Sequence, residues 1–185
     1  MRRRELLRWI AATTGYAFVG AERATAFGRA DPHSDRAYAA AELALLDEIA
    51  ETILPRTDTP GAKDAQVGAF IARYSTACYD DAQRSSLRVG LVDVDAQARK
   101  AFGRDFLHSS AEQRLALLKR IDAEAKHQAE EHPDTPPHWF TLAKQLTLYG
   151  FFTSEKGATQ VLRYRPIPGP YKGVVPYKKG DASWS

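Results

Sequence analysis

Apolar residues recur at steps of three and four along most of the chain, the spacing that places side chains on one face of an α-helix. Residues 40–54 show this spacing first, ahead of Pro55, with a stripe made of Leu43, Leu46, Ile49, Ala50 and Ile53. A second segment begins near Asp64, a candidate N-cap, and its stripe consists of Val67, Phe70, Ile71, Tyr74 and Cys78. A third begins after Asp80 or Asp81, with a stripe of Leu87, Leu91, Val94, Ala98 and Phe102. Each stripe predicts an amphipathic helix, and we therefore expect Cys78 to be buried.

Two further helices are predicted by starting signals and stripes. Ser109 with Glu112, or Ser110 with Gln113, has the spacing of a capping box, in which two side chains bond backbone amides at a helix start. The stripe that follows is Leu115, Leu118, Ile121 and Ala125. After the proline-rich break at 132–137, a helix from about Pro137 to Phe152 carries Trp139, Leu142, Ala143, Leu146 and Tyr149. Residues 153–155 are a candidate cap for a short helix that ends near Leu162.

The character of the chain changes after this point. Residues 165–177 contain four prolines and two glycines, and proline disrupts a helix because it lacks the amide hydrogen. Disordered tails are usually poor in aromatic residues, whereas this one carries Tyr164, Tyr171, Tyr177 and Trp184. Its composition leaves open whether it wraps around a partner or folds back over its own helices.

Together these patterns predict an all-α fold, a helical bundle of about five helices with an extended proline-rich C-terminal arm. No strand pattern of comparable length and no internal repeat occurs in the sequence. We expect a targeting peptide at 1–26, a linker at 27–38, a helical domain at 39–162 and the arm at 163–185. The length after the targeting peptide suits one domain with a sizeable core.

The first residues match a bacterial export signal. Arg3 and Arg4 form an arginine pair that precedes one variable and two apolar residues, an address for the twin-arginine translocase, which exports folded proteins. The apolar run at 9–20 is short for a membrane span, which needs about 20 apolar residues. Small residues at 24–26 offer a signal-peptidase site. We therefore expect a periplasmic protein; the alternative is a basic amphipathic helix that stays in the cytoplasm.

The net charge of +3 derives from this N-terminal peptide. The chain has 26 basic and 23 acidic residues, of which residues 1–26 hold five and two, leaving 21 of each. A nucleic-acid-binding protein carries its basic footprint on the folded domain, so we expect no nucleic-acid partner. Charge is still uneven, with six acids in 42–64 and five bases in 163–181, which indicates solvated faces or a docking tail. The single cysteine excludes an internal disulfide.

Catalytic motifs are scarce. The sequence contains no nucleophile elbow, no glycine-rich phosphate loop and no Cys-x-x-Cys-His haem motif. Glu124 and His127 have the Glu-x-x-His spacing of di-iron bundles, but such a site needs a second copy of the motif. A metal-binding helical-bundle enzyme is therefore only an alternative, and we expect no catalytic, cofactor-binding or metal-binding residue in this chain.

A chain that is exported folded, yet has no cofactor site of its own, fits a small subunit carrying the signal for a larger cofactor-bearing partner. A free periplasmic chaperone or binding module is the other alternative.

Two ordered blocks resemble the gluconate 2-dehydrogenase subunit 3 family. Residues 41–62 (AELALLDEIAETILPRTDTPGA) resemble its opening block, and residues 148–159 (LYGFFTSEKGAT) resemble its later block. The similarity spans most of residues 39–180. The segment at 161–169 is most similar to members that accompany sugar or glucoside 3-dehydrogenases.

This resemblance implies a small non-catalytic subunit beside a flavoprotein of the glucose-methanol-choline oxidoreductase family, which carries FAD, often with a c-type cytochrome as electron acceptor. The family supplies no catalytic residues to transfer. Aromatic residues are enriched in interface cores, so we take six of them as candidate partner contacts: Tyr149, Phe151, Phe152, Tyr164, Tyr171 and Trp184. Each could equally belong to the chain's own core, and for the first three we expect the core.

Overall fold

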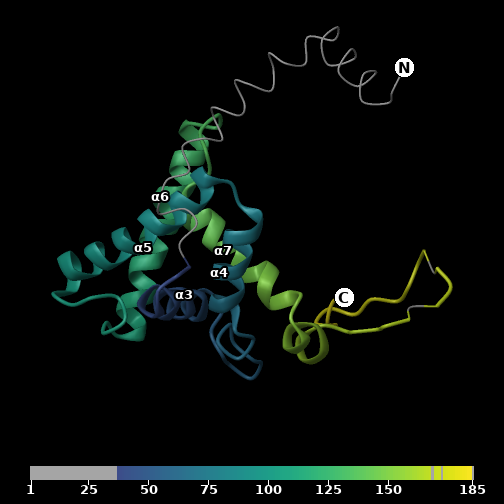
Figure 1. The fold of residues 1–185 in the computed structure, drawn as a ribbon. Coiled ribbons are helices and arrows are strands. Elements are labelled where there is room, and N and C mark those ends of the chain that lie inside the picture. Colours follow the sequence, from purple (N-terminus) through teal and green to yellow (C-terminus); the bar gives the residue numbers. More distant parts are fainter. Residues whose placement is uncertain (1–36, 168, 172, 185) are drawn as a thin grey trace, which may run out of the picture. The chain divides into compact units, whose positions relative to one another are not determined.

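The computed structural model describes residues 37–167, 169–171 and 173–184. Within them, five α-helices form a bundle (Figure 1): α3 (Ala40–Ile53), α4 (Val67–Cys78), α5 (Asp81–Phe102), α6 (Ala111–Glu131) and α7 (Trp139–Phe152). One π-helical turn, η1 (Gly157–Val161), follows α7. The described residues contain no strand, only an isolated bridge between Arg163 and Trp184. The prediction of an all-α bundle of about five helices is confirmed.

The expectations for the N-terminus concern residues that the structure does not describe. Arg3 and Arg4, the targeting peptide at 1–26 and linker residues 27–36 lie outside the described residues, so those expectations stay predictions. The helices and the arm belong to one compact unit, Ala37–Ser185. No helix in the described ranges has both the length and the apolar character needed to cross a membrane.

Capping residues explain where α5 and α6 begin and where α5 ends. The Asp80 carboxylate accepts the N–H of Gln83 at 2.8 Å, while Oε1 of Gln83 accepts the N–H of Asp80 at 3.3 Å. Ser110 and Gln113 form the same reciprocal pair at α6, with distances of 3.2 and 3.0 Å. Of the two predicted boxes, the one that forms is therefore Ser110 with Gln113. The helix α5 ends at Gly103, whose φ of 71° is the left-handed conformation that glycine adopts without steric cost.

A histidine caps the start of α7, which begins two residues after the predicted start at Pro137. Nδ1 of His138 accepts the N–H of Phe140 at 3.2 Å, which requires an unprotonated Nδ1. Burial lowers the pKa of His138, and the negative charges of Glu124 and Asp93 oppose this shift to a smaller extent. The neutral ring is therefore the form that caps α7.

The helix α7 contacts each of the other four α-helices, as α3 and α5 also do, and it has the largest buried share of the five. Eight of its fourteen residues are buried, more than one face supplies, as is typical of a helix surrounded by others. The approach of α5 is close because Gly90 lies against Trp139: a Cβ at Gly90 would be 2.2 Å from Cδ2 of the indole. The core therefore depends on α7 as a shared packing partner.

One capping prediction is wrong. Asp64 does not cap α4, whose N-cap is Gln66 with a φ of 54°. Instead, Oδ2 of Asp64 accepts the N–H of Gly61 at 3.0 Å, and Oδ1 pairs with Arg56 at 3.1 Å. The preceding loop supplies donors to this carboxylate, and they take the place of the helix amides.

Two burial predictions are also wrong. Cys78 is exposed, because α4 ends at this residue and Ser75, one turn earlier, is its last buried position. Leu115 is 43% exposed. The buried face of α6 is formed by Leu117, Leu118, Ile121 and Ala125, and helical geometry places Leu115 beside that face rather than on it.

Candidate partner-binding surface

The block at residues 41–62 includes the end of α3 and the loop before α4. Glu51, on the last turn of α3, accepts the backbone N–H groups of Arg56 at 2.9 Å and Lys63 at 2.8 Å. The N–H of Ala62 donates to the carbonyl of Leu54 at 3.0 Å. These bonds hold the two ends of the loop together, so this motif has a structural role.

The block at residues 148–159 ends α7 and turns the chain towards the arm. Oγ of Ser154 donates to the carbonyl of Phe151 at 2.6 Å and accepts the N–H of Gly157 at 3.0 Å. Oγ1 of Thr153 donates to the carbonyl of Tyr149 at 2.6 Å. Both carbonyls also accept backbone N–H groups, from Thr153 and Ser154 at 3.1 Å each. The hydroxyl groups therefore reinforce the end of α7, and η1 begins from a fixed turn.

An aromatic cluster lies where α4 meets the end of α7. The ring centroids of Phe70, Tyr74 and Tyr149 are between 5.5 and 5.7 Å apart, and the ring of Tyr79 lies 5.8 Å from that of Tyr74. Gly150 allows this contact, since a Cβ there would be 2.5 Å from the Phe70 ring. Burial raises the pKa of Tyr79, and the electrostatic interaction with Tyr74 raises it further, by a smaller amount. The Tyr79 hydroxyl therefore stays protonated. The cluster reaches the surface through Tyr149, which is 51% exposed.

The six predicted contact residues divide into exposed and buried positions. Five are exposed: Tyr149, Phe152, Tyr164, Tyr171 and Trp184. Phe151 is only 2% exposed and belongs to the core, as expected, whereas the expectation of a core position is wrong for Tyr149 and Phe152. Phe151 therefore offers no surface to a partner, while its neighbour Phe152 does.

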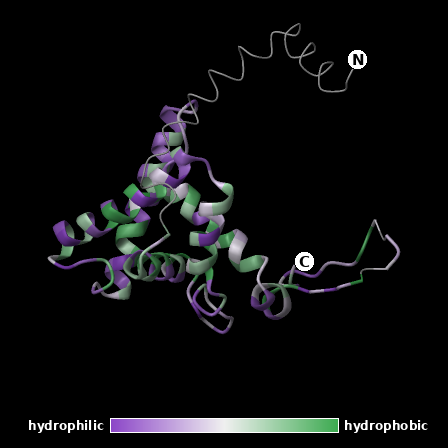
Figure 2. Cartoon of the chain, in the orientation of Figure 1, coloured by the Kyte–Doolittle hydropathy of each residue, from purple (hydrophilic) through white to green (hydrophobic). Residues whose placement is uncertain are grey.

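The arm, residues 163–184, follows η1 and extends away from the helices (Figure 1). Its hydrophobic segments are visible in Figure 2. Ile167 is 81% exposed, Tyr171 is 95% exposed and Val174 is 93% exposed. These side chains do not pack against the bundle, so the arm does not adopt the folded-back alternative.

Several contacts join the two ends of the arm, and we call the residues that form them, Arg163, Asp181, Ser183 and Trp184, the clasp. The N–H of Arg163 donates to the carbonyl of Ser183 at 2.8 Å, next to the parallel bridge with Trp184. The Arg163 guanidinium pairs with Asp181 at 3.0 Å and lies 5.3 Å from the centre of the Trp184 ring. Asp181 also accepts the N–H of Lys178 at 3.0 Å. The arm is therefore a closed loop rather than a free tail.

Sequence reasoning identified the aromatic residues of this surface but missed two of its features. Ile167 and Val174 are among its most exposed apolar side chains, and neither was named. The pairing of Arg163 with Asp181 was also missed. The sequence did contain an indication of this ion pair, since Asp181 is the single acid beside five bases in residues 163–181.

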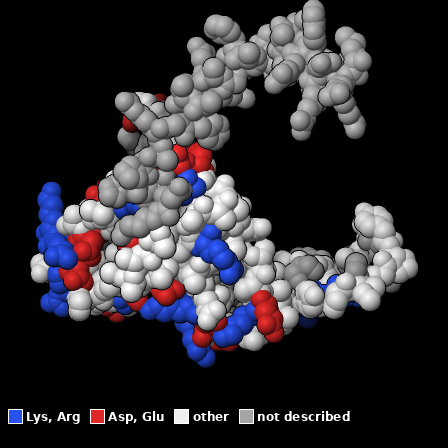
Figure 3. Space-filling view, in the orientation of Figure 1, with Lys and Arg blue, Asp and Glu red and all other residues white. Residues whose placement is uncertain are grey.

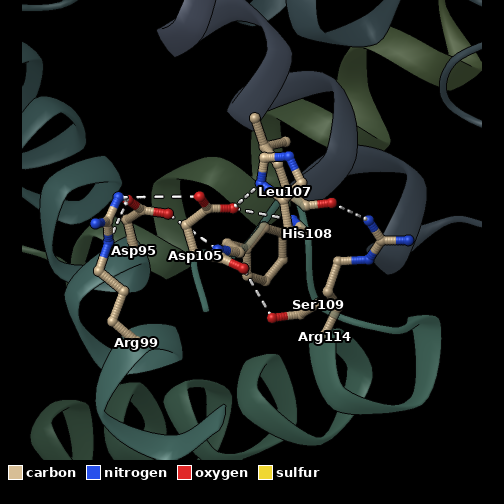
Figure 4. A network of polar contacts seen from close by, with 8 residues as sticks. Asp95, Arg99, Asp105, Leu107, His108, Ser109 and Arg114 are labelled. Atoms are coloured by element: carbon tan, nitrogen blue, oxygen red, sulfur yellow. Dashed lines mark hydrogen bonds and ion pairs between the residues drawn. The ribbon is translucent and has the colours of Figure 1, made fainter. Parts of the chain in front are cut away.

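A polar network fixes the loop between α5 and α6 (Figure 4). Asp95 accepts the N–H of Phe106 at 2.9 Å and pairs with Arg99 at 3.0 Å. Asp105 bonds Nδ1 of His108 at 2.6 Å and accepts its backbone N–H at 2.9 Å. Both hydrogen bonds lower the pKa of Asp105, and the bond from the imidazole ring has the larger effect. The network places the fully buried Phe106 in the core, so its ionisable groups serve the structure of the loop.

The two candidate metal ligands lie on the exposed side of α6 and have other partners. Glu124 pairs with Arg120 at 3.8 Å, and His127 pairs with Glu131 at 3.2 Å. Among the residues that the structure describes, no group of three or more His, Cys, Asp or Glu side chains is placed to hold a metal ion.

A surface hollow of about 420 Å³ lies between α3, α6 and α7, with apolar residues such as Leu118 and Phe140 in its lining. Its carboxylate, Asp122, forms ion pairs with Lys126 and Lys144. Hydrogen bonds from both lysines lower the pKa of Asp122, and the bond from Lys126 has the larger effect. The carboxylate is therefore ionised and already neutralised by its neighbours, and it is poorly suited to act as a general base.

Comparison with known proteins identifies the family. The family model described as gluconate 2-dehydrogenase subunit 3 matches residues 40–169, which include both sequence blocks and helices α3 to α7. No curated protein and no solved structure matches the chain significantly. The chain belongs to the gluconate 2-dehydrogenase subunit 3 family and is thus an accessory subunit of a dehydrogenase complex.

Proposed function

We propose that this chain is a non-catalytic subunit of a periplasmic, FAD-dependent sugar or glucoside dehydrogenase. Its partner would be a flavoprotein of the glucose-methanol-choline family, with a c-type cytochrome as a further subunit. FAD would reside in the flavoprotein and none in this chain. Family membership supports the accessory role, and the polar clusters described above are engaged in holding loops and helix ends.

The exposed apolar arm is the observation that carries the proposal. Monomeric soluble proteins rarely expose contiguous apolar patches larger than a few hundred Å², and large exposed aromatic residues are typical of interface cores. Here Tyr171 and Val174 are more than nine-tenths exposed on the arm, and Tyr149 is half exposed on α7. These side chains are therefore available to be buried by a catalytic subunit.

The arginine pair gives the subunit a second role, as the carrier of the export signal. A flavoprotein that lacks its own signal would bind FAD in the cytoplasm and cross the membrane attached to this chain, since the twin-arginine pathway exports folded proteins. Replacing Arg3 and Arg4 together by lysine is then expected to retain both proteins in the cytoplasm. Export of the flavoprotein without this chain would contradict the carrier role.

Deletion of residues 165–185 tests the arm directly. We expect the truncated chain to co-purify with much less flavoprotein while keeping the helical circular dichroism of the full chain, because the helices end before the deletion. Val89 and Val92, exposed by 64% and 73% on α5, provide a matched control: their replacement by serine removes exposed apolar groups elsewhere and should leave co-purification unchanged. A truncated chain that binds as well as the full chain would refute the role of the arm.

Size-exclusion chromatography of the native assembly separates a permanent subunit from a free chaperone. A permanent subunit elutes with the flavoprotein after export, whereas a chaperone that has released its client elutes alone.

A further inference from the structure

We propose that the arm is a pre-formed docking loop, held closed by the clasp, which enters an apolar groove with an acidic rim on the flavoprotein. This inference rests on the proposed function, because it takes the flavoprotein as the partner. It adds a positioning role for Trp184 and Asp181 and specifies the chemistry of the surface that receives the arm.

The contacts of the arm are concentrated at its base. Among the described residues of the arm, backbone hydrogen bonds occur only there, from Arg163 to Ser183 and from Asp181 to Lys178. A chain segment of this length with free ends samples many conformations, and ordering it on binding opposes association. By joining the ends before the partner arrives, the clasp reduces the conformational freedom that binding has to remove.

Polar contacts, rather than close apolar packing, hold the clasp together. A hollow of about 240 Å³ lies within it, lined by Arg163, Tyr177 and Trp184 among others. The ion pair between Arg163 and Asp181 and the contact of the guanidinium with the indole ring are therefore its main ties. Trp184 was predicted as a partner contact, and its position against Arg163 assigns it to shaping the arm.

The exposed surface of the arm defines the groove that fits it. The described residues of its outer part are uncharged in Figure 3, and Tyr171 and Val174 are almost fully exposed there. The sequence adds one base between these two residues, Lys172. Arg165, Lys178 and Lys179 are exposed nearer the clasp. The one acid of the arm, Asp181, is already paired with Arg163. An apolar groove flanked by carboxylates complements this arrangement in both hydrophobicity and charge.

A second copy of this chain is a poor match for such a groove. Its acid-rich segment, residues 42–64, is largely engaged within the chain. Five of its six carboxylates have partners within the chain: Glu42 with Arg88, Glu48 with Arg114, Glu51 with two backbone amides, Asp58 with the Thr57 hydroxyl, and Asp64 with Arg56. The charge complementarity therefore favours a different subunit over self-association.

Single substitutions in the full chain separate the clasp from the contact surface. The binding probe is the flavoprotein recovered with the wild-type chain from its native source. Asp181→Asn and Trp184→Ala alter the clasp, Trp184→Phe keeps an aromatic ring beside Arg163, and Tyr171→Ser alters the exposed surface. Asp134→Asn, in the exposed loop before α7, is the matched control for the change at Asp181.

We expect Asp181→Asn and Trp184→Ala each to weaken binding about fivefold, the scale of one exposed ion pair or cation–π contact. Both should also speed tryptic cleavage of the free chain after Lys178 and Lys179. Trp184→Phe should restore most of both properties. Tyr171→Ser should weaken binding by about tenfold, as loss of an interface aromatic does, with cleavage unchanged. Association should slow as ionic strength rises, because the groove is acidic.

Different failures have different meanings. If wild-type chain binds the flavoprotein but the clasp variants match it in cleavage and affinity, the pre-formed loop is wrong. If Tyr171→Ser binds as wild type does, or if the arm instead confers binding to vesicles of anionic phospholipid, the groove is wrong. If wild-type chain does not bind the flavoprotein, the proposed function itself fails.

Discussion

Replacing Glu51 by glutamine tests whether the first sequence block is structural. Oε1 and Oε2 of Glu51 accept one backbone N–H each, from Arg56 and Lys63, at 2.9 and 2.8 Å. Glutamine has the same shape but keeps one acceptor, and its NH₂ group would face the second amide, donor against donor. Hydrogen bonds to charged groups contribute about 1.5–3 kcal/mol. Because Glu51 is half-buried, we expect a loss of about 2 kcal/mol in unfolding free energy from one such bond.

Urea and thermal unfolding followed by circular dichroism measure this change. For a domain of this size, a loss of 2 kcal/mol corresponds to a decrease in Tm of about 4–8 °C. The amide hydrogens of Arg56 and Lys63 should also exchange faster with solvent. Glu130→Gln makes the same chemical change at an exposed position of α6 and should alter stability by less than about 0.5 kcal/mol. A Glu51→Gln chain as stable as wild type, in a complex that has lost turnover, would refute the structural interpretation of this motif.

Two further predictions concern α7. Gly90→Ala should lower the unfolding free energy by about 1–3 kcal/mol, the usual cost of overpacking a core, because the new Cβ would lie 2.2 Å from the Trp139 ring. If the variant unfolds thermally at the same temperature as wild type, close packing of Gly90 against Trp139 is not required for stability. His138 should make stability fall as the pH drops through the ordinary histidine pKa of 6.5, because burial lowers its pKa in the folded state and the unfolded chain then binds more protons. His138→Asn keeps a capping acceptor but cannot titrate, so its unfolding free energy, measured in urea between pH 5 and 8, should depend less on pH than that of wild type. An equal pH dependence in the two proteins would show that His138 is not the titrating group.

Periodicity was sufficient to predict helices α3 to α6 because each of them buries one stripe against its neighbours. The positions Leu87, Leu91, Val94 and Ala98 follow the predicted stripe of α5, and all four are buried. The caps of α5 and α6 were predictable for a related reason, since Asp80 and Ser110 each bond the residue three positions later. Contacts between nearby residues in regular structure leave a direct pattern in the sequence.

Predictions failed where tertiary contacts compete with local ones. Asp64 has the spacing of a helix cap, yet its carboxylate bonds Gly61 and Arg56 across the loop. Phe151 and Phe152 are adjacent aromatic residues, and only the arrangement of helices around α7 decides that the first is buried and the second exposed. The clasp joins Arg163 to residues 18 to 21 positions away through irregular backbone, where no period exists to reveal the pairing.

Turnover by the separated subunits decides whether this chain has a catalytic centre of its own. The purified chain, the purified flavoprotein and their complex would be compared for flavin absorbance and for sugar oxidation with an artificial electron acceptor. Both properties should appear only in the two samples that contain the flavoprotein, and the chain should stabilise the flavoprotein without adding a reaction of its own. Oxidation of a sugar by the purified chain alone would contradict it.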